Sequence, residues 1–143
     1  MQRIIIADAD ILVALAFEGD SNHEKAKDIA RGLHEKLYDV YFPNTAILEA
    51  ITALKRGLSQ PSKAHLINRQ YLAGAFDIIY VNEEIQQEAS RLFEEKANSK
   101  QNTIFDALVA TVAKNRSADA IFSFDNWYTK LGFASAADLV LTN

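Results

Sequence analysis

Short apolar runs alternate along the chain with longer segments of helical periodicity. Each run is rich in aliphatic or aromatic residues and stops at or just before a polar residue or a proline. Continuous apolar runs of this length are typical of the buried strands of a parallel sheet. The runs predict strands at Arg3–Ala7, Val40–Phe42, Asp77–Val81 and Ala120–Phe124, and an edge strand at Leu139–Leu141.

The segments between these runs have the spacing of helices. Some carry an apolar stripe on one face, as Asn22–Leu37 does, and others are apolar almost all round, which predicts burial. The remaining predicted helices are Thr45–Arg56, Pro61–Leu72, a segment capped by Asn82 and running to Ala97, Ile104–Asn115, Asn126–Leu131, and one starting at Ile11. Strands that alternate with helices predict an α/β fold, here a three-layer α/β/α sandwich around a parallel sheet of four to five short strands.

The composition leaves this predicted architecture unchanged and indicates how much of the chain it covers. The chain has 143 residues, with only five glycines and two prolines and no linker-like or repeated segment. A chain of this length can bury one sizeable core. We therefore expect a single domain over residues 1–143.

The chain has no cysteine, and its formal net charge is −4. Disulfides, cysteine-based metal sites and cysteine nucleophiles are thereby excluded. The apolar N-terminus resembles a secretion signal, but Asp8 and Asp10 interrupt its core. No other apolar run approaches the roughly 20 residues of a membrane span. We expect a soluble cytoplasmic protein that does not bind membranes.

Four acidic residues stand out because each interrupts an apolar context. Asp8 and Asp125 follow predicted strands, whereas Glu49 and Asp106 lie in the first turns of predicted helices. Ligand sites in parallel sheets form beyond the carboxyl ends of the strands. The pattern therefore predicts that these four side chains meet at one edge of the sheet.

Helix capping is the structural alternative for three of the four acids. Asp106 has the spacing for a capping box with Thr103, and Asp125 can cap the helix over Asn126–Leu131. Either Asp8 or Asp10 can cap the next helix, and for Asp10 we favour the cap. Glu49 has no such explanation, because an acid on an apolar helix face needs a partner.

Carboxylates brought together in this way need protons or a cation. Two charges about 4 Å apart repel by roughly 4 kcal/mol at an effective dielectric of 20. An all-oxygen site without cysteine or a partnering histidine favours a hard ion, Mg²⁺ or Mn²⁺. Such an ion would also reverse the local charge, so that an acidic protein can act on a polyanion.

The ordered set of motifs resembles the PIN-domain nucleases. Each motif is weak alone, but their order and spacing hold across nearly the whole chain. The motifs are Ile-Ile-Ala-Asp8-Ala-Asp10-Ile-Leu-Val-Ala-Leu, Glu49 after Pro43-Asn44-Thr45, Thr103-Ile-Phe-Asp106-Ala-Leu-Val-Ala, and Ser123-Phe-Asp125-Asn-Trp-Tyr followed by Leu131-Gly132.

This resemblance implies a metal-dependent endoribonuclease similar to the VapC toxins of toxin–antitoxin pairs. Asp8, Glu49, Asp106 and Asp125 would hold Mg²⁺ or Mn²⁺, and a metal-activated water would cleave RNA. Ser123 matches a hydroxyl position that would orient Asp125 or a water. The family also implies a homodimer and a small antitoxin partner. Asp10 departs from the Asn or Ser common there and would add a metal contact or serve as a cap.

Other functions remain open at this stage. A PIN-like module without catalysis, acting in binding or as a scaffold, is one alternative. A phosphatase resembling the haloacid dehalogenases, with Asp8 as nucleophile, is another, although Ile11 departs from that family's pattern. The usual sign of a silent module is the loss of one or more of the acids, and here all four are present.

Three further groups of side chains have a structural and a functional interpretation. The histidines share no metal-ligand spacing, and we expect them on solvated surfaces. Trp127 and Tyr128 would pack a short helix or stack an RNA base, and packing is favoured. A cluster of basic residues would either attract RNA phosphates or simply lie on a solvated turn. The histidines are His23, His34 and His65, and the basic cluster is Lys55, Arg56, Lys63 and Arg69.

Overall fold

A four-stranded parallel sheet forms the middle layer of the protein in this computed structural model, which describes residues 3–141. The strand order is β3-β2-β1-β4, and Ile6 of β1 pairs with Tyr41 on one side and Ile121 on the other. All carboxyl ends therefore lie at one edge. The strands are β1 (Ile4–Ala7), β2 (Asp39–Pro43), β3 (Ile78–Ile79) and β4 (Ala120–Phe122).

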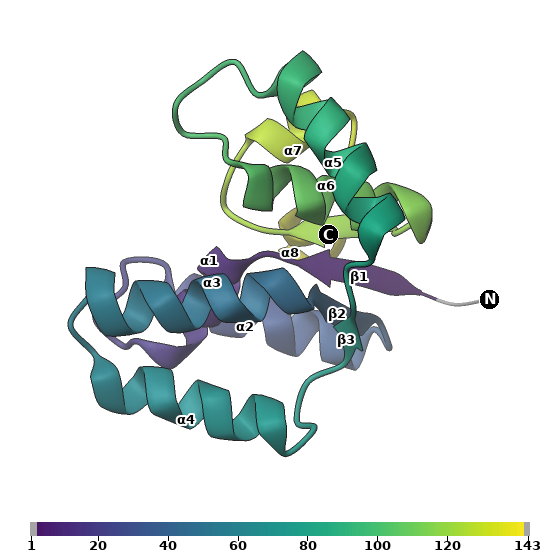
Figure 1. Cartoon of the computed structure of the whole chain (residues 1–143). Coiled ribbons are helices and arrows are strands. Elements are labelled where there is room, and N and C mark those ends of the chain that lie inside the picture. Colours follow the sequence, from purple (N-terminus) through teal and green to yellow (C-terminus); the bar gives the residue numbers. More distant parts are fainter. Residues whose placement is uncertain (1–2, 142–143) are drawn as a thin grey trace.

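Helices cover both faces of this sheet and make two separate cores (Figure 1). Because side chains alternate along a strand, Ile4 and Ile6 of β1 face one core and Ile5 and Ala7 face the other. The first core includes α5 (Glu83–Lys96), α6 (Ile104–Asn115) and α7 (Trp127–Lys130). The second includes α1 (Ala9–Ala16), α2 (His23–Glu35), α3 (Asn44–Thr52), α4 (Pro61–Leu72) and α8 (Ala136–Leu141). The predicted three-layer architecture is confirmed.

Local sequence signals place several elements as predicted. The helices α4 and α6 have the predicted bounds, and the side chain of Asn82 accepts a hydrogen bond of 2.9 Å from the Ile85 N–H, as expected of an N-cap. The strands β3 and β4 are shorter than the predicted ranges. Asp8 precedes α1, which begins at Ala9, two residues before the predicted start.

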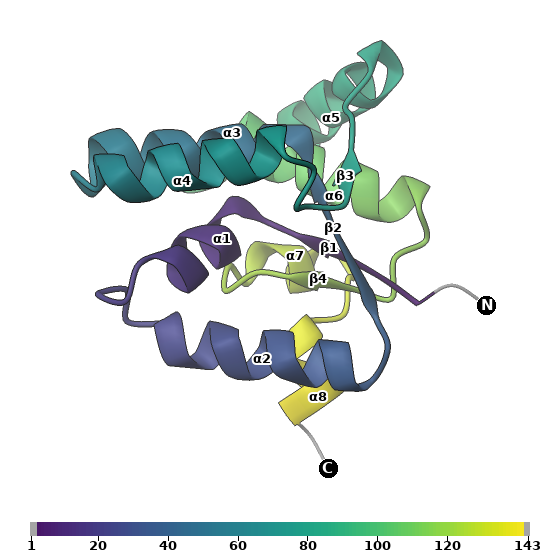
Figure 2. The same cartoon turned by 90° about the horizontal axis from the view of Figure 1, so that it is seen from below.

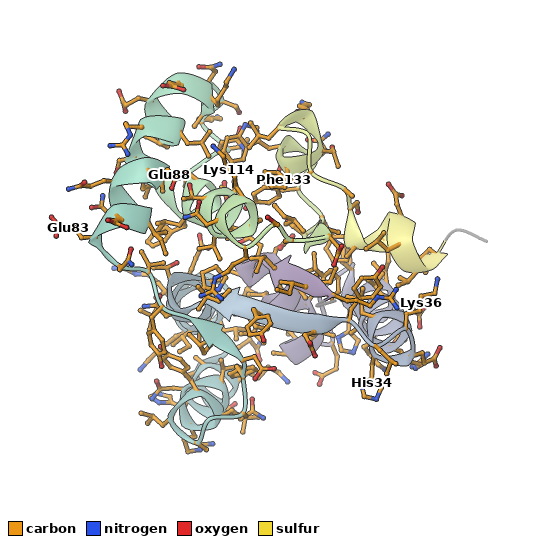
Figure 3. The ribbon with its side chains drawn as sticks, turned by 90° about the vertical axis from the view of Figure 1, so that its right-hand side faces the viewer. His34, Lys36, Glu83, Glu88, Lys114 and Phe133 are labelled. Carbon is orange, nitrogen blue, oxygen red and sulfur yellow. The ribbon has the colours of Figure 1, made fainter. Side chains whose placement is uncertain are left out.

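The predicted edge strand at Leu139–Leu141 is wrong, because these residues belong to α8. The Ser135 Oγ accepts a hydrogen bond from the Ala137 N–H, and the helix then packs beside α2 (Figure 2). Lys36, the residue that follows α2, is labelled in Figure 3, and its Nζ donates to the Leu139 carbonyl at 2.9 Å. A three-residue apolar run fits a strand or a buried helix equally, so only this packing decides between them.

The predicted helix over Thr45–Arg56 is interrupted rather than continuous. Regular α-helix ends at Thr52, whose Oγ1 donates to the Leu48 carbonyl. The next five residues form a π-turn, η1 (Ala53–Gly57), closed by a hydrogen bond from the Leu58 N–H to the Ala53 carbonyl. Such turns have no distinct periodicity signal in a sequence, which explains why the pattern did not reveal it.

None of the helices within residues 3–141 combines the length and apolar character that crossing a membrane requires.

The packing of α8 on α2 generates a test of the fold. A Cβ built at Gly32 of α2 would lie 2.8 Å from the Val140 Cβ, whereas one at Gly57 would meet nothing within 4 Å. Alanine would gain about 1 kcal/mol of helix propensity over glycine. At Gly32 we expect the clash to outweigh that gain, so that Gly32→Ala lowers the free energy of unfolding by about 1–3 kcal/mol.

Urea unfolding of Gly32→Ala beside Gly57→Ala measures this difference. The Gly57 variant should be as stable as the wild type or slightly more so. If Gly32→Ala is equally well tolerated, α8 does not pack where the structure places it.

Candidate active site at the carboxyl edge of the sheet

One cavity of about 360 Å³ lies beyond the carboxyl ends of the strands and gathers the predicted acids. Its walls include all four of them together with Asp10, and none of its lining residues within 3–141 is basic. Parallel strand direction accounts for this convergence, because Asp8 directly follows β1 and the Asp125 loop follows β4. The acids lining the cavity are Asp8, Asp10, Asp20, Glu49, Asp106 and Asp125.

Asp8 is the most deeply held of these acids, with only 4% of its surface exposed. Its Oδ1 accepts a hydrogen bond of 2.6 Å from the Ala9 N–H, so Asp8, not Asp10, is the N-cap of α1. Its Oδ2 accepts a hydrogen bond of 2.6 Å from the Tyr128 hydroxyl. Both carboxyl oxygens are therefore held in place by neutral donors, and each keeps acceptor capacity for a further partner.

Asp106 completes the predicted capping box with Thr103. Its Oδ2 accepts from the Thr103 N–H at 2.9 Å, and the Thr103 Oγ1 accepts from the Asp106 N–H at 3.4 Å. The Tyr128 hydroxyl also lies 3.5 Å from the Asp106 Oδ1. The capping role is thus real, but it uses one oxygen and leaves the other facing Tyr128.

Asp10 links the start of α1 to the loop that follows β4. Its Oδ2 accepts hydrogen bonds from the Ser123 Oγ at 3.0 Å and from the Phe124 N–H at 2.8 Å. Its Oδ1 is buried and has no hydrogen-bond partner in the described part of the chain. The preference for Asp10 as a helix cap was wrong, because its carboxylate instead joins two elements far apart in sequence.

Ser123 and Asp125 order the loop in front of α7. The Ser123 Oγ accepts a hydrogen bond from the Asp125 N–H at 3.1 Å, and the Asp125 Oδ1 accepts from the Trp127 N–H at 2.9 Å. Ser123 therefore fixes the backbone of Asp125, close to its expected orienting role. The capping alternative for Asp125 holds only in part: Asn126 is the N-cap of α7, although the Asp125 carboxylate accepts from the first N–H of that helix.

Glu49 and Asp20 line the cavity from α3 and from the loop between α1 and α2. The Glu49 carboxylate has no hydrogen bond to any residue in 3–141, so nothing in that range offsets its charge. Asp20 was missed by the sequence analysis, because it lies in a polar loop where an acid needs no explanation. Its Oδ1 accepts from the Asn22 N–H at 2.8 Å.

Burial and mutual repulsion raise the pKa values of these acids. Burial, followed by the charge of Asp10, raises the pKa of Asp8 well above its usual value, although the Tyr128 hydrogen bond opposes the rise. Burial raises the pKa of Asp10 to about 6. Burial and then the Asp106 charge raise the pKa of Glu49 to about 7, and burial also raises that of Asp106. The cavity thus holds protons more tightly than isolated carboxyl groups do.

The donor chemistry of this cavity fits a hard divalent cation. Its ligand atoms are carboxylate oxygens, and Asp10 contributes a buried oxygen without a partner. Within residues 3–141, however, no three Asp, Glu or His side chains are arranged closely enough to hold a metal ion as they stand. Carboxylates without a cation between them repel one another, so a ligand set of this kind would close only around the ion.

Tyr128 joins the site through its hydroxyl, a role that the sequence analysis did not anticipate. Its ring and that of Trp127 are buried, with 2% and 6% exposed, so the packing interpretation is confirmed for both. Burial and the neighbouring Asp8 charge raise the pKa of the Tyr128 phenol, which keeps it a donor. In the sequence, the only signal for this role is that a tyrosine, with a hydroxyl able to donate, stands three residues after Asp125.

The histidine and basic-cluster predictions have mixed outcomes. His34 and His65 are exposed as expected, but His23 is half-buried and its Nδ1 lies 2.6 Å from the Ala14 carbonyl oxygen. In the basic cluster, Lys63 forms an ion pair of 3.0 Å with Glu18. Lys63 is therefore engaged within the protein, while Lys55, Arg56 and Arg69 remain exposed.

Solved structures share this fold at low sequence identity. VapC20 of Mycobacterium tuberculosis, a sarcin–ricin loop cleaving toxin, aligns with a TM-score of 0.78 and 21% identity over 91% of this chain and 96% of its own. A toxin–antitoxin complex from Klebsiella pneumoniae aligns with a TM-score of 0.58 and 19% identity, covering 85% and 87% of the two chains. FitAcB from Neisseria gonorrhoeae aligns with a TM-score of 0.61 and 15% identity, covering 92% and 95%. No curated protein matches the chain in sequence.

A three-layer α/β/α fold with acids at the carboxyl edge matches that of the PIN-domain nucleases, which generally use divalent metal ions. The sequence model of the PIN domain matches residues 5–134. The chain belongs to the PIN domain family, and the predicted resemblance is confirmed.

The contact between Tyr128 and Asp8 generates a test of the site. Tyr128→Phe keeps the packed ring and removes the donor to a buried carboxylate, which should lower the free energy of unfolding by about 1–3 kcal/mol. Tyr41→Phe is the matched control, because Tyr41 is half-buried and its hydroxyl has no partner within residues 3–141. Urea unfolding of both variants should separate them, and equal stabilities would mean that the hydroxyl does not hold Asp8.

Proposed function

We propose that this chain is a metal-dependent endoribonuclease of the VapC toxin type. In this proposal Asp8, Glu49, Asp106 and Asp125 hold Mg²⁺ or Mn²⁺ and are the catalytic acids of one domain. The observation that carries the proposal is the single cavity in which these carboxylates meet without a basic lining residue in the described chain. Repulsion among them is relieved by protons or by a cation, and at neutral pH a cation is the stronger competitor.

The cation would supply Lewis-acid polarisation of a phosphodiester and orientation of the attacking water. The residues of the chain prepare the cavity for that ion. The Ala9 N–H and the Tyr128 hydroxyl orient Asp8, and the Thr103 N–H orients Asp106. These donors fix the orientation of Asp8 and Asp106 only, so the acids would still have to draw together around the ion, above all Glu49, whose carboxylate has no hydrogen bond within residues 3–141.

Asp10 has a positioning role in this proposal. Its hydrogen bonds to Ser123 and to the Phe124 N–H hold the loop that carries Asp125 against the first turn of α1. Its unpartnered Oδ1 is a further candidate for contact with the cation or with a water. Ser123 supports Asp125 through the Asp125 N–H.

RNA as the substrate is supported by the similarity to VapC20, which cleaves the sarcin–ricin loop. A small antitoxin as a partner is supported by the similar complex from Klebsiella pneumoniae, and a homodimer follows from the family resemblance alone. An RNA substrate and a chain without cysteine both fit action in the cytoplasm. A nucleophilic Asp8, as in a phosphatase, is disfavoured by the family match, because the PIN domain model spans residues 5–134.

Cleavage of a labelled single-stranded RNA pool with Mn²⁺, with Mg²⁺ and with EDTA tests the proposal. We expect cleavage with either ion and none with the chelator. Cleavage that survives EDTA would contradict the metal-dependent mechanism. No cleavage across the pool with either ion would favour a PIN-like module that binds without catalysis.

Asp106→Asn separates the proposed metal role from the capping role. It should lower RNA cleavage by about 100-fold or more, because a charged ligand is lost. Without metal it should be at least as stable as the wild type, since the amide oxygen can still accept from Thr103 and one repelling charge is removed. Asp106→Ala, which also loses the cap, should lower the free energy of unfolding by about 1 kcal/mol.

Cleavage rates and urea unfolding in EDTA check both parts, with Asp77→Asn as an exposed control that should change neither. An active Asp106→Asn variant would remove Asp106 from the metal site. If Asp106→Asn is much less stable than the wild type without metal, the repulsion between Asp106 and the neighbouring acids is too weak to affect the free energy of unfolding.

A further inference from the structure

A second hollow of about 470 Å³ adjoins the acidic cavity. Asp125 and Gln101 line both, so the two hollows share a wall. The second hollow lies between the loop that joins α5 to α6 and the residues that start α7, which are side by side in Figure 1. Sites for small ligands usually have volumes of about 300–1,000 Å³, so this hollow is large enough for one.

Three carboxamides and one ammonium group line this hollow without internal partners. The side chains of Gln101, Asn102, Asn126 and Lys130 make no hydrogen bond or ion pair with residues 3–141. Each carboxamide carries both a donor and an acceptor, the pattern that the edge of a nucleobase also presents. The polar groups of this hollow are therefore available to a ligand.

Aromatic side chains supply the apolar part of the same hollow. Phe124 is half-buried and offers ring surface to the hollow, with the Lys25 Nζ 5.7 Å from its ring centroid. Trp127 is buried and only lines the wall, held by a hydrogen bond of 3.3 Å from its Nε1 to the Lys96 carbonyl. Single-stranded RNA is recognised in this way, by contact of a splayed base with an aromatic ring and by hydrogen bonds to its edge.

The charge around the hollow favours a base over a phosphate. Lys130 is its only basic lining residue within 3–141, and Asp125, which has the opposite charge, also lines it. A phosphate there would meet the Asp125 carboxylate, whereas an uncharged base would not be repelled. The scissile phosphate itself belongs in the neighbouring cavity, where the proposed cation would offset the carboxylates.

We propose that this hollow binds the base of a nucleotide adjacent to the scissile phosphate of single-stranded RNA. Gln101, Asn102 and Asn126 read the edge of the base, and Lys130 contacts the strand that leaves it. This inference rests on the proposed ribonuclease function. It adds a determinant of cleavage-site preference that lies outside the four acids.

The test compares cleavage-site preference and RNA binding. A randomised single-stranded RNA pool is cleaved with Mn²⁺ and the product ends are sequenced, for the wild type, Asn126→Ala, Gln101→Ala and Lys130→Ala. We expect the carboxamide variants to reduce base preference at one flanking position by about tenfold, and Lys130→Ala to raise KM with little change in kcat. Asn115→Ala, an exposed carboxamide at the far end of α6, is the matched control and should behave as the wild type.

Binding is measured separately in the Asp106→Asn background. Fluorescence anisotropy with labelled oligo(A), oligo(C) and oligo(U) in EDTA should show a preference among the three, which Asn126→Ala reduces and Asn115→Ala preserves. A wild type that cleaves RNA while Asn126→Ala and Gln101→Ala keep its preference would overturn the subsite but not the nuclease function. No cleavage by the wild type, together with equal binding of the three oligonucleotides by Asp106→Asn, would overturn both.

Discussion

Repulsion among buried carboxylates at one edge of the sheet is the constraint on which the rest of this structure depends. Asp8, Asp10, Glu49 and Asp106 each have a pKa raised by burial, and the Asp8 and Glu49 pKa values are raised further by neighbouring acids. The rest of the fold has to offset the free-energy cost of burying these carboxylates close together. Hydrogen bonds from neutral donors reduce that cost for Asp8, Asp10 and Asp106, while Glu49 has no such donor among residues 3–141. In the proposed function, a cation shared among the acids would make the arrangement favourable.

The two apolar cores, one on each face of the sheet, stabilise the fold against the cost of this cluster of acids. The alternating side chains of β1 anchor cores on both faces. Asp8, Asp106 and Asp125 lie at or next to element ends, whereas Glu49 extends from within α3. Asp8 and Asp106 each belong to a helix cap, so their positions are set by backbone hydrogen bonds that form whether or not an ion is present. Capping and ligation are thus compatible uses of one side chain, not competing explanations of it.

Much of this architecture could be predicted from the sequence, because its signals are local. Apolar runs revealed the four strands, Pro61 and the Asn82 cap revealed helix starts, and the Thr103–Asp106 spacing revealed the capping box. Strand direction then brought the four acids together. Features that depend on distant contacts could not be predicted: α8 is helical because of its packing on α2, and Asp10 reaches the β4 loop across more than a hundred residues. The link from Tyr128 to Asp8 is of the same kind.

The pH dependence of unfolding, with and without metal, tests the central claim most directly. Acids whose pKa is raised in the folded state keep protons that the unfolded chain has released, so stability is lost as the pH rises toward the folded-state values. With the pKa of Asp10 at about 6 and that of Glu49 at about 7, urea unfolding in EDTA should give a free energy about 1–3 kcal/mol lower at pH 7.5 than at pH 5. Mn²⁺ should restore most of that loss at pH 7.5. A metal-free stability that is constant or rises over this range, or no effect of Mn²⁺ at pH 7.5, would contradict the account.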